Sequence, residues 1–246
     1  LCYQKDSVPD ALALLKKAVN DDDMRVRMHG VRALSFYEPT DKAEQALEIA
    51  YDVLRHPTDD YIKHVFGECQ KGLQSVLKSK VLPKDPGALA EFIANTKDND
   101  LNGLPDVEPV LIEKLTRPRI QAIVRMNALE ALVKLKGNDR PLEIINLLKL
   151  LDAKEGSGST ADEIGKMMLT DKTGIVTRHG LALKALAKDA KTAQVKRAAF
   201  AALVYAARGP DEIWKETASD GGQLNYLVES IANLPASEAA LRTKFQ

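Results

Sequence analysis

The stretch Asp23–Leu34, "DMRVRMHGVRAL", returns in altered form as Ile123–Leu132, "IVRMNALEAL", and as Gln194–Leu203, "QVKRAAFAAL". All three copies fit the motif V-[RK]-x-x-[GA]-φ-x-A-L, in which φ is an apolar residue. A segment that recurs within one chain is typical of architectures built from stacked, similar units. The residues that mark the three copies are Val26, Arg27 and Leu34; Val124, Arg125 and Leu132; and Val195, Lys196 and Leu203.

The spacing of the motif predicts a helix with one buried face. Its valine, small residue, alanine and leucine lie zero, four, seven and eight positions along, which places them on one side of an α-helix. The small residue allows close approach of a neighbouring backbone, but such a face buries too little area in an isolated pair. We therefore expect stacked pairs, with the basic residue on the flank, where it reaches a carboxylate or carbonyl of the adjacent repeat.

The rest of the chain favours the same all-α fold. Aromatic residues make up only 5% of the sequence, alanine and leucine dominate the apolar set, and no convincing strand-like alternation occurs. We predict an α-solenoid of stacked antiparallel helix pairs over residues 1–246 as a single domain. Two segments interrupt it, a polar loop at 97–104, "KDNDLNGL", and a possible flexible connector at 154–160, "KEGSGST".

Charge and hydropathy argue against two classes of partner. The 35 basic and 35 acidic residues give a formal net charge of zero, which disfavours a nucleic-acid binder, although a local basic face remains possible. No apolar run approaches the roughly 20 residues of a membrane helix, so we expect no membrane insertion. The chain begins at Leu1 and shows no signal peptide, so we expect it to be part of a longer protein.

The sequence offers few groups for chemistry. No HExxH, P-loop, GxSxG or CxxC pattern occurs, so we predict no catalytic, cofactor-binding or metal-binding residue and no bound cofactor. Cys69 reads as a small core residue, with a Cys2–Cys69 disulfide as the alternative. A metal site at His56 and His64 is weaker than a solvated turn, and His29 and His179 are expected to be partly buried and hydrogen-bonded.

Other residues have similarly ordinary interpretations. The acidic clusters at 20–23 and 58–61 fit helix capping better than weak calcium binding. Trp214 is expected to anchor a late helix, with a ligand groove as the alternative. Two lysine-rich stretches, 77–85 and 187–197, are mixed with aspartate and are expected to be solvated faces.

The repeated motif resembles the second helix of HEAT repeats, the two-helix units of α-solenoids. In that family an aspartate commonly precedes the valine and an arginine follows it. Asp23 fits this pattern, whereas Gln121 and Thr192 stand at the equivalent position of the second and third copies. The motif is therefore degenerate, and the resemblance implies the class of fold without a repeat count.

A narrower resemblance covers nearly the whole chain. "ALEIAYDVLRHPTDDYIKHVFGECQKGL", "EPVLIEKLTRPRIQAIVRMNALEAL" and "VKRAAFAALVYAARGPDEIWKETAS" occur in the same order as similar segments of large secreted planctomycete-type bacterial proteins. Those proteins join a β-propeller, often called a membrane-bound dehydrogenase domain, to HEAT repeats and a CxxCH cytochrome c domain. Neither the propeller nor CxxCH occurs here, so the resemblance carries over no catalytic or haem-ligating residue. It implies a periplasmic or extracellular location.

Three functions follow as hypotheses. The first is a non-enzymatic scaffold and docking domain of a larger secreted bacterial redox protein, whose partners are protein domains of the same or another chain. Haem would then be present only through a neighbouring domain. The second is a free-standing HEAT adaptor that binds a protein or peptide. The third is a HEAT-like enzyme such as a DNA glycosylase, which the neutral charge and the single tryptophan disfavour.

Overall fold

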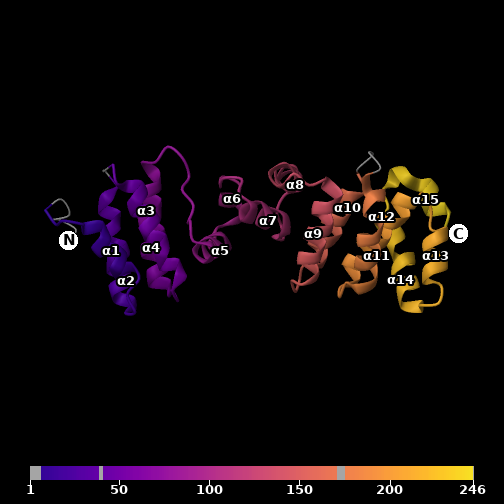
Figure 1. Ribbon diagram of the computed structural model, residues 1–246, viewed down its shortest axis with the longest axis horizontal. Helices are drawn as coiled ribbons and strands as arrows, with labels where there is room; N and C mark the ends of the chain where they lie inside the picture. Colours follow the sequence, from indigo (N-terminus) through magenta and orange to yellow (C-terminus); the bar gives the residue numbers. More distant parts are fainter. Residues whose placement is uncertain (1–6, 39–40, 171–174, 246) are drawn as a thin grey trace. The chain divides into compact units, whose positions relative to one another are not determined.

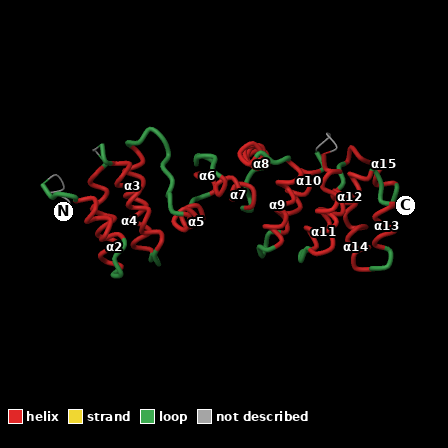
Figure 2. Tube along the Cα trace, viewed as in Figure 1, coloured by secondary structure: helices red, strands yellow, loops and turns green. Residues whose placement is uncertain are grey.

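The computed structural model describes residues 7–38, 41–170 and 175–245. The chain is all-helical, with 74% of residues in helices. The described ranges contain fifteen α-helices joined by turns and short 3₁₀ segments, and no strand (Figures 1 and 2). The all-α prediction is confirmed. Contacts along the chain divide it into two compact units, residues 1–105 and residues 106–246, and each is described by itself below.

The first unit contains six α-helices within its described residues. They are α1 (Ala11–Val19), α2 (Met24–Leu34), α3 (Ala43–Tyr51), α4 (Asp60–Ser75), α5 (Pro86–Asn95) and α6 (Asp98–Leu101), with 3₁₀ turns η1 (Ser35–Tyr37) and η2 (Asp52–Arg55).

Aspartates set where helices of this unit begin. The carboxylate of Asp23 accepts the Arg25 N–H at the start of α2, and Asp59 accepts the Ile62 N–H at the start of α4. Each bond satisfies a helix N–H that has no partner within the helix. The acidic clusters at 20–23 and 58–61 therefore act as helix caps, as predicted.

Packing in the first unit follows a regular order. α1 packs on α2 and α3 packs on α4; α1 also contacts α3, and α2 contacts α4. The core side chains are mainly alanine and leucine, and Tyr51 contacts the rings of Phe66 and Phe92 near the α5 end. At Gly30 the lack of a side chain lets α2 approach α1 closely.

The buried face of α1 is formed by Ala11, Leu12, Leu15 and Val19. One local prediction in this unit is wrong. The predicted polar loop at 97–104 contains α6, a single helical turn whose Leu101 is fully buried. One apolar residue in a polar stretch is enough to dock a turn when the core offers it a site.

The second unit contains nine α-helices within its described residues. They are α7 (Glu108–Thr116), α8 (Ala122–Lys136), α9 (Arg140–Asp152), α10 (Gly158–Met168), α11 (Gly180–Asp189), α12 (Ala193–Ala207), α13 (Asp211–Thr217), α14 (Gly221–Glu229) and α15 (Ala239–Thr243), with 3₁₀ segments η3 (Ile175–His179), η4 (Ser230–Asn233) and η5 (Ala236–Glu238).

α12 is the central helix of the second unit. It packs on α10, α11 and α14, and its residues Ala198–Tyr205 are all buried. Alanines make this crowding feasible, since a Cβ added to Gly165 of α10 would lie only 2.5 Å from the Ala198 Cβ. Ala198 is not one of the small positions of the motif; those are Ala199 and Ala202, and both are fully buried.

The predicted connector at 154–160 is only partly a loop. Gly158, Ser159 and Thr160 already belong to α10, and Ser157 is buried, with its hydroxyl donating to the Leu151 carbonyl at 2.5 Å. The serine and threonine that suggested flexibility instead start a helix, which is a common role of these residue types.

Candidate functional site

The motif arginine of the first copy binds the turns around it. Arg27 is 5% exposed, and its guanidinium donates to the carbonyls of Asp21 and Asp22 at 2.8 and 2.9 Å. It also donates to the Pro57 carbonyl at 3.0 Å, in the turn that precedes α4. One buried arginine thus joins the α1–α2 turn to the turn of the next helix pair.

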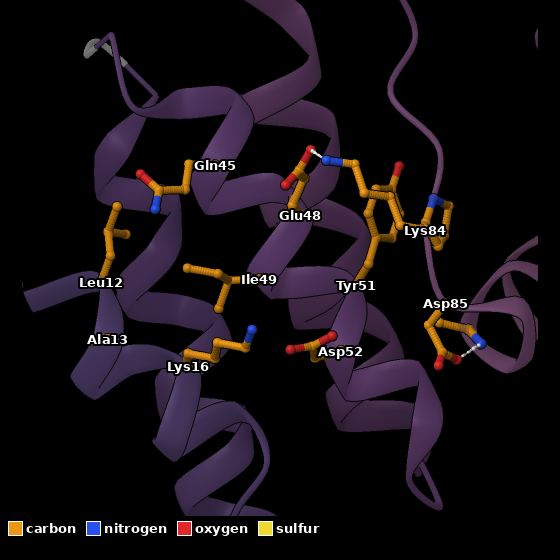
Figure 3. A pocket seen from close by; sticks show the side chains of 12 residues that line it. Leu12, Ala13, Lys16, Gln45, Glu48, Ile49, Tyr51, Asp52, Lys84 and Asp85 are labelled. Carbon is orange, nitrogen blue, oxygen red and sulfur yellow. Dashed lines mark hydrogen bonds and ion pairs between the residues drawn. The ribbon is translucent and has the colours of Figure 1, made fainter.

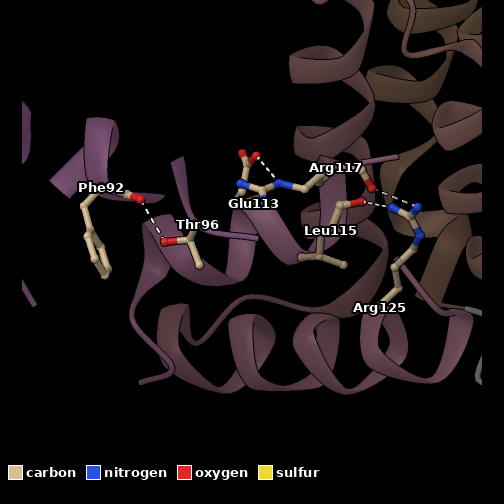
Figure 4. Close-up of polar contacts among 6 residues, drawn as sticks. All are labelled: Phe92, Thr96, Glu113, Leu115, Arg117 and Arg125. Atoms are coloured by element: carbon tan, nitrogen blue, oxygen red, sulfur yellow. Dashed lines mark hydrogen bonds and ion pairs between the residues drawn. The ribbon is translucent and has the colours of Figure 1, made fainter. Parts of the chain in front are cut away.

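The motif arginine of the second copy has the same kind of role. Arg125 is 2% exposed and donates to the carbonyls of Leu115 and Arg117 at the end of α7 (Figure 4). Its Nε lies 3.1 Å from a carboxylate oxygen of Glu163, on α10. Burial lowers the pKa of Arg125, and Glu163 opposes that effect. Arg125 therefore contacts both α7 of its own helix pair and α10 of the following pair.

The valines of the motif differ from prediction. Val26 is 39% exposed, Val124 is half-buried, and only Val195 is fully buried. In the first two copies the arginine points inward, so the preceding valine, about 100° around the helix, turns toward solvent. In the third copy Lys196 is half-buried and lies over the Tyr226 ring at 5.0 Å, and the valine occupies the core.

The leucines of the motif are in the core in every copy. Leu34 is fully buried, Leu132 is 1% exposed and Leu203 is 6% exposed. Each of the nine motif residues thus either packs between helices or lies at the surface of the protein.

The histidines do not converge on a common site. His56 Nε2 lies 3.1 Å from Asn20 Oδ1, and His179 Nε2 lies 2.8 Å from Asp139 Oδ2. His29 is exposed, so its predicted partial burial is wrong, and His64 is exposed as well. Across residues 7–38, 41–170 and 175–245, no three His, Cys, Asp or Glu side chains are grouped to hold a metal ion.

The structure confirms the prediction for Cys69 and contradicts the prediction for Trp214. Cys69 is a free thiol, 1% exposed, and burial raises its pKa to about 12, so the prediction of a small core residue is confirmed. Its alternative partner Cys2 lies outside the described residues. Trp214 is 38% exposed, and Ile213 anchors α13 in its place.

A large open groove runs along one side of α4. It has a volume of about 960 Å³ and is lined by side chains from α4, η2, α5, α6 and the loops beside them. Four of these, Leu54, Phe66, Phe92 and Leu104, are apolar and form its floor, since all are buried or half-buried. We call this hollow the α4 groove.

Lysines surround the floor of the α4 groove. Lys63, Lys71, Lys80 and Lys97 are all exposed and line it, together with only two carboxylates, Glu68 and Asp100. Within the part of the chain that the structure describes, none of the four ammonium groups takes part in an ion pair. The rim therefore carries an excess of uncompensated positive charge.

The groove is open along one side of α4, and α6, which contributes Asp100 to its lining, is a single helical turn. Gly67 shows the space that remains, because a Cβ added there would meet no atom within 4 Å. Lys63, Gly67 and Lys71 lie four residues apart, on one stripe of α4 that faces this space.

A second, smaller cleft lies between α1, α3 and the loop before α5 (Figure 3). It has a volume of about 370 Å³, and its charged groups largely neutralise each other. Lys84 Nζ lies 2.5 Å from Glu48 Oε1, and that contact raises the pKa of Lys84. Asn20 donates to Asp52 at 3.2 Å. Because Lys84, Glu48 and Asp52 already have partners, this cleft is the weaker candidate for a binding site.

Comparison with known proteins adds no assignment. No family model, no curated protein and no solved structure matches the chain. Among the described helices, none is both long and apolar enough to cross a membrane.

Sequence reasoning did not find the α4 groove. Lys80 was interpreted as part of a solvated face and Lys97 as part of a polar loop, and Lys63 and Lys71 were not singled out. The available signal was Lys63, Gly67 and Lys71 at four-residue spacing within one helix. A glycine inside an otherwise strong helix weakens it, so it usually has a packing or functional reason.

Proposed function

We propose that this chain is a non-enzymatic docking platform, a HEAT-like α-solenoid that binds another protein along its second helices. The observation that carries the proposal is the α4 groove, an open hollow with an apolar floor and unpaired charge on its rim. Binding surfaces of helical-repeat proteins have this extended form, and a buried apolar centre with a polar rim is typical of protein interfaces.

The solenoid part of the proposal is supported by repetition of contacts. Arg27 and Arg125 occupy the same motif position, and each joins its own helix pair to the following one through backbone carbonyls or a carboxylate. α1 contacts α3 as α2 contacts α4, the order expected when pairs stack. Such equivalent joints favour a stacked array within each unit over an irregular helical globule.

The wider context rests on the resemblance to secreted planctomycete-type redox proteins. In that setting the platform would space and dock domains such as a propeller or a cytochrome c in the periplasm or outside the cell. Sequencing the gene beyond the codon for Gln246 tests this. A downstream CxxCH supports it, whereas a reading frame without propeller or CxxCH on either side leaves the free-standing adaptor.

The docking function is tested by crosslinking in the native cells. A photoreactive amino acid is placed at Lys71 or Lys97 on the groove rim, or at the exposed Lys17 of α1 as the matched control. The proposal expects one protein to be captured from both rim positions and not from Lys17. The purified partner should then bind the full chain, and Gly67→Trp, which fills the groove, should weaken that binding.

Two results would overturn the docking function. One is capture from the rim positions that is no greater than from Lys17. The other is a captured partner whose affinity for the chain is the same with Gly67→Trp as with the unaltered groove. Circular dichroism of each variant confirms that the helical fold is retained.

A further inference from the structure

We propose that the α4 groove takes an acidic amphipathic helix of the partner protein, with apolar side chains on the groove floor and carboxylates against the lysine rim. This inference rests on the proposed docking function and adds the chemistry of the partner. It is argued from the charge of the rim, from the shape and composition of the groove, and from the state of its aromatic rings.

The positive charge of the groove rim favours a partner segment of negative charge. Four exposed lysines line the groove, and only Glu68 and Asp100 oppose them. The whole chain has a net charge of zero, so this excess is local. Uncompensated charge around an interface steers partners of opposite charge and repels those of like charge. An acidic segment therefore fits the rim, and a basic one does not.

The shape and volume of the groove favour a helix as its occupant. α4 meets α2 on one side as a helix packed on a helix, and the groove lies on its other side, where α6 stops after one turn. A helix about 10 Å across and two turns long fills a volume similar to the 960 Å³ of the groove. The glycine at position 67 allows the backbone of such a helix to approach α4 closely.

The groove floor supplies the apolar contact. Leu54, Phe66, Phe92 and Leu104 are the apolar side chains that line the groove, together with the four lysines of the rim. An amphipathic helix that docks in a groove inserts apolar residues spaced at i, i+3 or i+4, and i+7, which matches a two-turn site. The polar groups nearby are already used, since Gln74 bonds Ser79 and Val81, and Thr96 donates to the Phe92 carbonyl (Figure 4).

The aromatic rings argue against a nucleic acid as the occupant. Proteins that bind single strands stack bases on exposed aromatic faces above a basic groove. Phe66 and Phe92 are 8% and 9% exposed, and each packs against the Tyr51 ring, with centroids 5.8 and 5.4 Å apart. They provide a floor for aliphatic side chains but no free face for a base.

The experiment measures fluorescence anisotropy with defined probes and the full chain. The main probe is a labelled 16-residue peptide with leucines at i, i+4, i+7 and i+11 and glutamate or alanine elsewhere. The comparison probes replace glutamate by lysine, replace leucine by serine, or are a 16-nucleotide oligothymidine. We expect saturable binding of the acidic leucine peptide, at least about tenfold tighter than that of any comparison probe.

Variants locate the binding on the chain. The double substitution Lys63→Glu with Lys71→Glu, and separately Gly67→Trp, should each weaken the acidic peptide by at least about tenfold. The matched controls are Lys17→Glu, an exposed lysine on α1, and Gly180→Trp, a glycine that also faces open space. Both controls should leave affinity within about twofold, because neither residue lines the groove and an exposed charge outside it is screened.

Several outcomes would overturn the acidic-helix proposal. They are tighter binding of oligothymidine or of the lysine peptide, equal binding of the serine peptide, and affinity that the groove variants leave unchanged. If the acidic peptide fails while a partner crosslinked at Lys71 still binds through the groove, the partner chemistry is wrong and the docking platform stands. If neither the acidic peptide nor a crosslinked partner binds through the groove, the docking function itself fails.

Discussion

Gly30 and Gly67 are both interior glycines of helices in the first unit, yet their surroundings are opposite. A Cβ added at Gly30 would lie 3.0 Å from the Val19 nitrogen and 3.1 Å from two carbon atoms of Ala18, so the backbone of α1 limits the space. At Gly67 the same atom would meet nothing within 4 Å. One glycine permits close packing of α2 on α1, and the other leaves a groove open.

The same substitution should therefore have opposite effects at these two positions. Gly67→Ala should raise the free energy of unfolding by about 1 kcal/mol, because alanine favours the helix and no atom opposes it. Gly30→Ala should lower it by roughly 1–3 kcal/mol, since a crowded backbone contact outweighs that gain. Urea unfolding followed by circular dichroism measures both. Stabilisation by Gly30→Ala would show that α1 and α2 are more loosely packed than the structure has them.

The motif positions show what a residue pattern can predict. The spacing placed Leu34, Leu132 and Leu203 in the core, and it foresaw that the basic residue reaches a carbonyl or carboxylate of the adjacent pair. It did not foresee that Arg27 and Arg125 would be buried in place of the valine. Periodicity treats arginine as a surface residue, but here turn carbonyls converge to solvate its guanidinium.

Asp152 links two elements of the second unit. It is the last residue of α9, and its carboxylate accepts the N–H groups of Lys191 and Thr192, at 2.8 Å each for the closest contacts. The Thr192 hydroxyl also donates to it at 2.8 Å. These groups stand at the start of α12, so the C-terminal residue of α9 caps the N-terminus of α12. Burial opposes ionisation, but the bonds outweigh it and lower the pKa of Asp152.

The lowered pKa makes this cap dependent on pH. The carboxylate form is stabilised by folding, so its contribution is complete above the ordinary aspartate pKa of about 4 and is lost as pH falls through the lower folded value. Asp152→Asn should therefore destabilise the chain by roughly 1–3 kcal/mol at pH 7 and by progressively less toward pH 3. Thermal unfolding across that range measures it.

A matched control is Asp189→Asn, at the exposed C-terminal end of α11. It should change stability by no more than about 0.5 kcal/mol at any pH, as most exposed substitutions do. An Asp152→Asn variant whose loss of stability is the same at pH 7 and pH 3 would contradict the charged cap. Burial also opposes ionisation of Asp139, but its hydrogen bonds with the Leu142 N–H and with His179 outweigh that effect and lower its pKa. Asp139 should therefore retain its own pH dependence in both variants.

At the scale of the whole molecule, the sequence predicted the all-α class and most helices but not the irregular parts. Helices such as α4 and α12 are long and periodic, so their existence follows from pattern and capping alone. α6 and the α4 groove escaped prediction because both depend on tertiary packing, through the burial of Leu101 in one case and the spacing of α4, α5 and α6 in the other. The early start of α10 escaped it because "GSGST" resembles a linker until Ser157 is seen to be buried.

The two compact units have separate interiors, and this predicts two unfolding events. Core residues of the second unit form one cluster that extends from Leu111 to Leu241, while the first unit builds its own interior around residues such as Leu34, Leu47 and Leu73. Gly30→Ala strains the first unit. Gly165→Ala strains the second, where the new Cβ would lie 2.5 Å from the Ala198 Cβ.

Differential scanning calorimetry of the full chain should resolve two transitions, with Gly30→Ala lowering the temperature of one and Gly165→Ala that of the other. The reason is that strain inside a cooperative unit destabilises that unit alone when few contacts cross to its neighbour. Gly67→Ala should raise the transition that Gly30→Ala lowers, which assigns that transition to the first unit. A single transition that both strained variants shift equally would instead mean that the whole chain unfolds as one cooperative unit.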